Sequence, residues 1–257
     1  MFRHPVLRTS AYLDLYANAA ADELSRDDGR LDLAIIRRII AQKIRPAGVL
    51  DVGCGAGDFL LTLPGEVAKY GVEPSVAAVA AATKRGLSIL APTLTQMPPQ
   101  LNFDVITMID VIEHVSVPGD LLDQALSHLA PGGSLIIATG DAGNAMWRRV
   151  FRSRFWYLSF PEHTTFPSLR YFHIWHEGRE LKSPTAVRLK YRRIPFWRAA
   201  LYFTSQATYL VSPRLLNQVG RGIEWLRRTP APRRRFFSPG APGVFTDHQI
   251  VTIQRLP

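Results

Sequence analysis

A glycine-rich turn follows the first apolar run that reads as a strand, in the stretch VLDVGCGAGDF at residues 49–59. Its glycines stand at alternate positions, so a ligand can approach the bare backbone and face the amide N–H groups at the start of the next helix. The fingerprint of a dinucleotide site is GxGxxG, and the position of its third glycine is occupied here by Asp58. This carboxylate and that of Asp51 would repel a diphosphate. The turn therefore predicts a ligand with a cationic portion.

A further acidic residue, Glu73 in GVEPS, follows Asp51 by 22 residues, where a second strand is expected to end. A carboxylate at this point of an α/β sheet can accept hydrogen bonds from both hydroxyls of a ribose. The predicted ligand then has a ribose, a positive region and no diphosphate. S-adenosylmethionine has these properties.

A second group of polar residues lies in DVIEH, where Asp110, Glu113 and His114 stand at positions i, i+3 and i+4. This spacing brings the three side chains together if the stretch is helical. Three roles remain open: a polar cap on the loop, acid–base chemistry, and the binding of a divalent metal. We carry Glu113 and His114 forward as catalytic candidates, and a metal is the role we favour least.

A third candidate is His163 in PEHTTF, which follows the expected fifth strand. An imidazole there could accept the proton of a phenol or hydroxyl group while its oxygen attacks a methyl group. The alternative is a histidine that only packs among Tyr157, Phe160 and Phe166. Cys54, inside the glycine-rich turn, is interpreted as a small residue that fills the turn, and we assign it no chemistry.

The elements that must position these residues alternate between strand and helix. Helical patterns occupy residues 31–44, 75–86 and 118–130, and strands are expected at residues 48–52, 67–72, 103–109, 134–139, 186–194 and 248–256. This alternation predicts an α/β fold, a doubly wound parallel sheet with helices on both faces. Ligands of such sheets bind at the carboxyl ends of the strands, near the point where strand order reverses. Residues 140–175, rich in aromatic and turn residues, show no clear pattern.

Taken in order, DxGxG, the acid after the second strand, FDVITMIDVIEHVSVP and LAPGG resemble the motifs of class I S-adenosylmethionine-dependent methyltransferases. Within that family the chain looks most like the branch that modifies small molecules, quinones, sugars and lipids. The resemblance covers about residues 31–172. It implies a Rossmann-like sheet of seven strands with the last strand antiparallel, an N-terminal helix and a basic helical insertion as covers.

The resemblance also assigns residues to parts of the cofactor. It implies that the methionine portion, the ribose and the sulfonium are contacted by Asp51, Gly53, Cys54, Gly55, Glu73, Met108, Ile109 and Asp110. Family members often carry an acid that faces the adenine amino group after the third strand. Here APTLTQMP offers Thr93 and Gln96 instead.

The implied reaction is transfer of a methyl group to a small-molecule or lipid-linked acceptor, with oxygen favoured as the acceptor atom. C-methylation of a sugar or quinone ring, nucleic-acid methylation and a cofactor-binding protein without turnover remain alternatives. Against nucleic acid, residues 109–111 read Ile-Asp-Val. Amino-directed nucleic-acid methyltransferases of this fold often carry (D/N)PP(Y/F) there.

Length and composition are those of an ordinary globular chain, with 257 residues, 47% of them hydrophobic and 20% charged. We predict one methyltransferase domain over residues 1–257, with a cofactor-binding core at 31–140, acceptor-side loops at 141–185 and a basic aromatic insertion at 195–244. The single cysteine excludes an intrachain disulfide framework and a multi-cysteine zinc site. It also favours a reducing, cytoplasmic compartment.

The net charge of +10 is concentrated in one segment. Residues 185–239 hold twelve Lys or Arg and one acid, Glu224, and so carry +11. Aromatic residues lie between these arginines, which is typical of a helix at a membrane interface. We predict that residues 188–235 bind an anionic membrane surface or a lipid-linked acceptor. A nucleic-acid partner and a solvated cover over the acceptor cleft are the alternatives.

Overall fold

The structure is a computed structural model, and it describes residues 30–42, 48–144, 157, 163–189 and 247–257. In chain order the elements in these residues are α2 (Leu31–Ala41), β1 (Gly48–Val52), α3 (Asp58–Leu61), β2 (Ala68–Val72), α4 (Val76–Lys84), β3 (Ser88–Ala91), η2 (Leu94–Gln96), β4 (Phe103–Ile109), η3 (Ile112–His114), α5 (Pro118–Ser127), β5 (Leu129–Gly140), α6 (Leu169–His176), β6 (Thr185–Leu189) and β7 (His248–Gln254).

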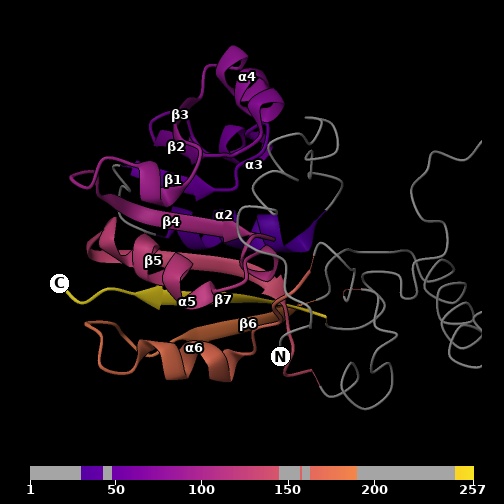
Figure 1. The fold of residues 1–257 in the computed structure, drawn as a ribbon, viewed down its shortest axis with the longest axis vertical. Coiled ribbons are helices and arrows are strands. Elements are labelled where there is room, and N and C mark those ends of the chain that lie inside the picture. Colours follow the sequence, from indigo (N-terminus) through magenta and orange to yellow (C-terminus); the bar gives the residue numbers. More distant parts are fainter. Residues whose placement is uncertain (1–29, 43–47, 145–156, 158–162, 190–246) are drawn as a thin grey trace, which may run out of the picture.

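The strands form one sheet of seven in the order β3-β2-β1-β4-β5-β7-β6 (Figure 1). Strands β1 to β5 pair in parallel, whereas β7 runs antiparallel to both β5 and β6. The predicted α/β fold with an antiparallel last strand is therefore confirmed. Strand order reverses between β1 and β4, the place where ligand sites form in such sheets.

Both faces of the sheet are covered, because alternate residues of each strand point to opposite sides. In β1, Val49 packs with α2 and α3 in one apolar cluster, while Leu50 packs with α5 and α6 in another. Figure 1 shows α5 and α6 in front of the sheet and α2 behind it. The core thus consists of two apolar layers that fix the sheet, and with it the strand ends that carry the polar motifs.

The predicted strands at residues 48–52 and 103–109 match β1 and β4 residue by residue. The predicted helix at 118–130 is wrong at its end, because α5 stops at Ser127 and β5 begins at Leu129, which pairs with Phe103 of β4. Helix α6 was not predicted. Its buried residues, Phe172 and Trp175, sit three apart among histidines and arginine, a pattern too short to stand out from the aromatic residues around it.

Several predictions fall on residues that the structure does not describe. These include the basic aromatic insertion at 195–244, almost all of the basic segment at 188–235, and the strand residues after Leu189. Within the described ranges, no helix has the length and apolar character needed to cross a bilayer.

The turn between β1 and α3 depends on glycine at residue 57, which has a φ of +81°. A Cβ there would lie 1.9 Å from Cδ1 of Leu87, whereas one on Gly86, at a φ of +84°, would meet nothing within 4 Å. Both Gly57→Ala and Gly86→Ala should therefore lower the free energy of unfolding by about 1–2 kcal/mol, because alanine is strained in the left-handed conformation. Only Gly57→Ala should lower the free energy of unfolding by a further ~1–3 kcal/mol, because its Cβ would overpack against Leu87. Urea unfolding of the two variants checks this, and equal losses would contradict it.

Candidate functional site

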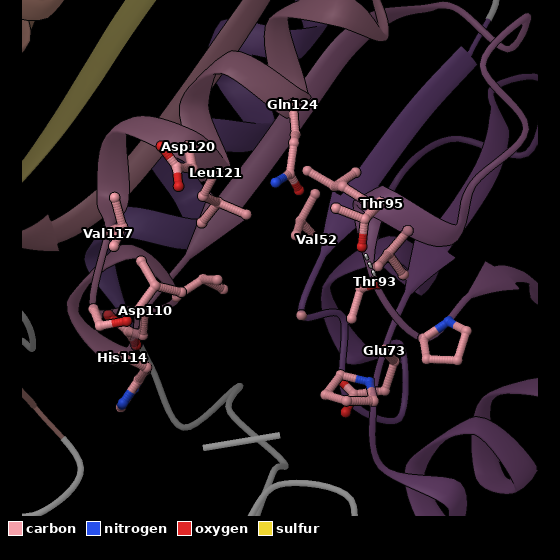
Figure 2. Close-up of a pocket in the computed structure, with 18 of the residues that line it drawn as sticks. Val52, Glu73, Thr93, Thr95, Asp110, His114, Val117, Asp120, Leu121 and Gln124 are labelled. Carbon is pink, nitrogen blue, oxygen red and sulfur yellow. Dashed lines mark hydrogen bonds between the residues drawn. The ribbon is translucent and has the colours of Figure 1, made fainter. Parts of the chain in front are cut away.

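A cavity of about 300 Å³ opens at the carboxyl ends of β1, β2 and β4. Figure 2 shows it between two walls, one with Glu73, Thr93 and Thr95, the other with Asp110 and the start of α5. Its lining includes Val52, Gly53, Gly55, Val72, Glu73, Thr93, Leu94, Thr95, Asp110, Val111, His114, Val117, Asp120, Leu121 and Gln124. Among these described residues are three carboxylates and no Lys or Arg. The cavity therefore suits a ligand with apolar surface and positive charge.

The glycine-rich turn forms the floor between β1 and β2. Gly53 and Gly55 have φ values of +69° and +56°, and the backbone N–H of Gly53 donates to the carbonyl of Val72 at 2.7 Å. A Cβ on Gly53 would lie 2.7 Å from Cγ2 of Val111, so the turn and the chain after β4 are in close contact. Glycine is required here because of both its conformation and this contact.

Glu73, directly after β2, is buried with 4% of its surface exposed and still lines the cavity. Its Oε2 accepts from the N–H of Gly55 at 2.8 Å, and its Oε1 accepts from the N–H of Ser75 at 2.8 Å. An ionised carboxylate can accept about four hydrogen bonds, and Glu73 lines the cavity. Glu73 thus fixes the glycine turn and presents acceptors to a ligand.

The region predicted to meet an adenine is only partly at the cavity. Thr93 lines it, and its hydroxyl contacts the hydroxyl of Thr95 at 2.8 Å and Oε1 of Gln96 at 3.2 Å. Gln96 is exposed and absent from the lining. Instead, Gln124 reaches the cavity from α5 (Figure 2). Sequence reasoning missed Gln124, because the pattern of α5 marks its buried side but not what that side faces.

Three other predicted cofactor residues are absent from the lining of the main cavity. Asp51, Cys54 and Ile109 line a second, much smaller cavity with Leu33 of α2. Met108, the fourth, belongs to β4 and is fully buried in the core. Oδ1 of Asp51 accepts from the Thr107 hydroxyl at 2.6 Å. Burial and the charges of Asp51 and Glu73 raise the pKa of the Cys54 thiol far above its usual range, so it is not a nucleophile near neutral pH.

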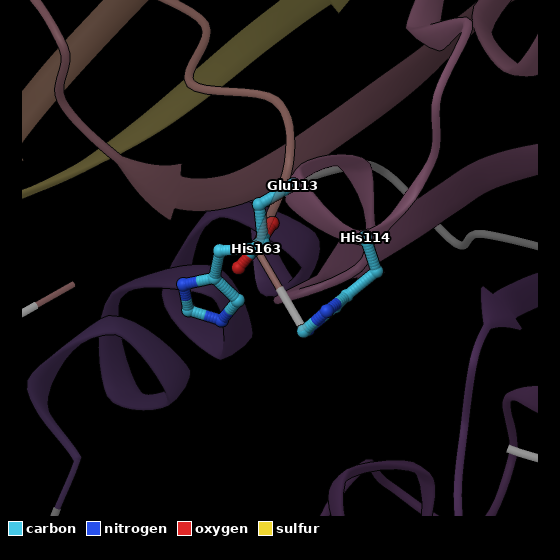
Figure 3. A group of neighbouring side chains, drawn as sticks. All are labelled: Glu113, His114 and His163. Atoms are coloured by element: carbon cyan, nitrogen blue, oxygen red, sulfur yellow. The ribbon is translucent and has the colours of Figure 1, made fainter. Parts of the chain in front are cut away.

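The catalytic candidates form a compact cluster beside this cavity (Figure 3). Glu113 is fully buried, and its Oε1 accepts from the Tyr157 hydroxyl while its Oε2 accepts from the Thr139 hydroxyl at 3.0 Å. His114 lines the cavity, and its ring centre lies 4.7 Å from that of His163. The Nδ1 atom of His163 contacts the carbonyl of Tyr157 at 2.5 Å. The structure thus brings together the residues predicted from two distant motifs.

Electrostatics in this cluster are governed by burial. Desolvation, followed by the charge of Asp110, raises the pKa of Glu113 above its ordinary value, although His163 and Tyr157 oppose the shift. Burial and the charge of Glu113 raise the pKa of Tyr157 well above its ordinary value. Tyr157 therefore stays a hydrogen-bond donor to Glu113 at neutral pH.

A metal ion is one alternative for this cluster, because ligand atoms of Glu113, His114 and His163 lie within 4.8 Å of one another. The carboxylate oxygens of Glu113, however, already accept from the hydroxyls of Tyr157 and Thr139. A metal would have to displace these donors from a fully buried group. The chemistry of the donor set therefore favours a hydrogen-bonded cluster over a metal centre.

Asp110 does not share one helical turn with Glu113 and His114, contrary to the helical reading of DVIEH. The short helix η3 begins only at Ile112, and Asp110 has a φ of +53°. Its Oδ2 instead accepts from Nη1 of Arg30 at 2.7 Å, and its Oδ1 lies 3.9 Å from Nε2 of His248. Sequence reasoning did not single out Arg30 or His248, because both reach the site only through long-range folding.

The position of His248 predicts a pH dependence of folding. Burial lowers the pKa of this imidazole, but the hydrogen bond to Asp247 and the charges of Asp247, Asp110 and Asp32 outweigh burial and raise it above 6.5. The folded protein then holds the proton more tightly than the unfolded chain. The stabilisation is present below about pH 6.5 and is lost as pH rises through the folded-state pKa. Urea unfolding across this range should show the loss in the unmodified protein and not in His248→Asn.

Comparison with known proteins agrees with this geometry. A model of the methyltransferase domain matches residues 24–182. The ubiquinone biosynthesis O-methyltransferase of Bradyrhizobium sp. (strain ORS 278) is 35% identical over 100 residues, which is 35% of this chain and 39% of that relative. The chain thus spans about two fifths of the length of this relative. The tRNA U34 carboxymethyltransferase of Pseudoalteromonas atlantica is 29% identical over 182 residues, covering 65% of this chain and 54% of that protein.

A solved structure extends the comparison to the whole fold. The N-methyltransferase NodS from Bradyrhizobium japonicum, in complex with S-adenosyl-L-homocysteine, aligns with a TM-score of 0.54 at 14% identity, over 95% of this chain and 97% of that one. At this identity the likeness concerns the fold, the class I Rossmann-like fold predicted from the motifs. The chain belongs to the methyltransferase domain family.

Proposed function

We propose that this protein transfers the methyl group of S-adenosylmethionine to a small-molecule or lipid-linked acceptor, on an oxygen atom. The observation that carries the proposal is the cavity at the switch point, with its glycine turn, the buried acceptor Glu73 and a lining of carboxylates without Lys or Arg. Its volume is within the range of small-molecule sites, which starts at about 300 Å³. Glu73 and Asp120 would repel a diphosphate and attract a sulfonium, whereas the charge of Asp110 is paired with Arg30.

Different residues of the cavity would contact different parts of the cofactor. Glu73 would accept from the ribose hydroxyls, the backbone of Gly53 and Gly55 would hold the methionine portion, and Thr93 with Leu94 would flank the base. When bound, S-adenosylmethionine supplies an activated methyl group and its own leaving group. The protein then has two tasks, to align the acceptor and to remove its proton.

Proton removal is assigned to the histidine pair at the edge of the cavity. Because Nδ1 of His163 faces the Tyr157 carbonyl, this nitrogen carries the ring hydrogen and Nε2 carries the lone pair. His114 lines the cavity next to His163 and can orient an acceptor hydroxyl. Glu113 holds Tyr157, and Tyr157 holds His163, so the base has a fixed tautomer.

His163→Ala should lower turnover by roughly 10²–10⁴-fold at saturating cofactor, because a positioned base contributes that much. Its affinity for S-adenosylmethionine should stay close to that of the unmodified protein, since His163 is not among the cavity-lining residues. His176→Ala, on α6, serves as the matched control. Full turnover of His163→Ala with bound cofactor would exclude this residue as the base.

Oxygen is favoured as the acceptor atom by the name of one relative, an O-methyltransferase of ubiquinone biosynthesis that matches 35% of this chain. C-methylation of a sugar or quinone ring would also release a proton to a base, so the histidine pair fits that reaction too and the preference for oxygen rests on the relative. The tRNA-modifying relative keeps a nucleic-acid acceptor as the second candidate.

The cofactor assignment is tested by calorimetric titration with S-adenosylmethionine, S-adenosylhomocysteine and NAD⁺ in parallel. We expect both sulfur compounds to bind one site in competition and NAD⁺ to give no binding heat at the same concentration. Binding of NAD⁺ with no binding of S-adenosylmethionine would contradict the charge argument.

We further propose a peripheral, cytoplasmic protein that meets lipid-linked acceptors through residues 188–235. The support is the charge of this region, +11 over residues 185–239, with interleaved aromatic residues. Sedimentation with vesicles of phosphatidylglycerol and phosphatidylcholine should show binding that persists in part at high salt, through aromatic insertion. Replacement of Arg233, Arg234 and Arg235 by alanine should weaken it. Binding to RNA but not to vesicles would favour the nucleic-acid alternative.

A further inference from the structure

A buried ion-pair cluster lies directly behind the cavity, between α2 and the end of β4. The side chain of Arg30 is fully buried. Its Nε donates to Oδ1 of Asp32 at 3.0 Å, its Nη2 donates to the other Asp32 oxygen, and its Nη1 donates to Oδ2 of Asp110 at 2.7 Å. One guanidinium therefore ties the first turn of α2 to the residue that follows β4.

The backbone of Asp110 is unusual. Among the residues that the structure describes, Asp110 is the one non-glycine residue with a positive φ, +53°. The left-handed region is unfavourable for a residue with a Cβ, and such a conformation persists only where its surroundings hold it. Residues of this kind concentrate at functional sites.

Contacts on several sides hold Asp110 in this conformation. Its N–H donates to the carbonyl of Ala138 in β5 at 2.9 Å. Its Oδ2 faces Arg30, and its Oδ1 lies 3.9 Å from Nε2 of His248, whose Nδ1 is 3.2 Å from Asp247. The carboxylate is thus placed between Arg30, the residue before α2, and His248 of β7, which are far apart in the sequence.

The turn at Asp110 determines where the next residues lie. Cγ2 of Val111 fills the space that a Cβ on Gly53 would need, so Val111 closes the wall against the glycine turn. The N–H of His114 donates to the Val111 carbonyl at 2.9 Å, and His114 lines the cavity. A change in the backbone of Asp110 would therefore move both the cavity wall and His114.

We propose that Arg30 is a positioning residue: its buried guanidinium holds Asp110 in the left-handed turn that sets Val111 and His114 against the cavity. Arg30 itself does not line the cavity, so it acts through Asp110. The catalytic consequence rests on the proposed function. The turn, by contrast, is a property of the protein without any ligand.

The turn is tested first by hydrogen exchange of peptides that span residues 110–117, in the unmodified protein, Arg30→Ala, Asp110→Gly and the double variant. Arg30→Ala should raise exchange of these amides by about tenfold or more, since local opening is no longer opposed. In the background of Asp110→Gly, the same change should add less than about threefold, because glycine adopts this φ without support. Arg38→Ala, at an exposed position in the last turn of α2, is the control and should have no effect.

The functional arm uses the same variants with S-adenosylmethionine and an acceptor extract, at temperatures where circular dichroism shows each to be folded. Arg30→Ala should lower methyl transfer by roughly 10²-fold, because small misplacements of catalytic groups cost that much. Arg30→Lys keeps the charge but lacks the guanidinium that pairs with both carboxylates. Its rate of methyl transfer should lie between those of the unmodified protein and Arg30→Ala. This variant replaces Arg30→Ala if the latter does not fold.

Unchanged exchange at residues 110–117 in Arg30→Ala, or an equal increase in both backgrounds, would overturn the proposal. Absence of methyl transfer in the unmodified protein would count against the proposed function alone, since the exchange experiment still decides the role of Arg30.

Discussion

Replacing Glu73 with glutamine is expected to weaken the binding of S-adenosylmethionine by roughly 10²-fold, as for the loss of a buried, charge-assisted hydrogen-bond acceptor. Both oxygens of Glu73 accept from backbone N–H groups, those of Gly55 and Ser75. A glutamine amide places an NH₂ group against one of these donors, so either the glycine turn or the start of α4 must shift. It also removes the charge that would hold the ribose hydroxyls.

Calorimetric titration of Glu73→Gln measures this loss directly. Glu66→Gln, at an exposed position before β2, is the matched control and should bind like the unmodified protein. An affinity for Glu73→Gln within a few-fold of the control would show that the carboxylate does not contact the cofactor.

Replacing Glu113 with alanine is expected to have the second large effect. It would leave the hydroxyls of Tyr157 and Thr139 without their shared acceptor in a fully buried space. We expect a loss of about 3–5 kcal/mol in the free energy of unfolding, from the cavity and the lost hydrogen bonds together. Turnover of the folded variant should fall by roughly 10²-fold, because the tether from Glu113 through Tyr157 to His163 is cut.

Urea unfolding and single-turnover methyl transfer separate these two effects. Glu177→Ala, exposed at the end of α6, controls for the loss of a carboxylate elsewhere. A variant that is destabilised but turns over at the normal rate while folded would show that Glu113 has no catalytic role. Glu113 would then be the polar cap on the loop, the alternative that the sequence left open.

The strands that carry the site could be predicted because each is a short apolar run bounded by turn residues. β1 and β4 are buried on both faces, and most residues of their sequences, GVLDV and FDVITMI, are apolar. The end of each run then places Gly53 and Asp110 at the same edge of a parallel sheet. This local rule located the cavity without any tertiary information.

Local patterns could not say which way a side chain faces after the strand ends. Asp51 and Cys54 belong to the glycine motif but line the smaller cavity on the side of α2, while Gln124 of α5 reaches the main cavity. The difference depends on the register between helix and sheet, which motif spacing does not contain.

The residues that hold the site carboxylates in place could not be predicted from the sequence for a related reason. Tyr157 is separated from Glu113 by 44 positions, and Arg30 from Asp110 by 80. In the sequence, Tyr157 is one aromatic residue among many, and Arg30 is a charge before a helix. Only the folded chain reveals that each one is buried against a carboxylate.

The central claim is methyl transfer to a small or lipid-linked acceptor, and one measurement tests it most directly. The protein and Glu73→Ala are incubated separately with methyl-labelled S-adenosylmethionine and a cell extract, which is then fractionated into lipid, water-soluble, protein and nucleic-acid pools. We predict label in the lipid or water-soluble pool with the unmodified protein and none with Glu73→Ala. Label confined to the nucleic-acid pool, or no label despite measured cofactor binding, would contradict the account.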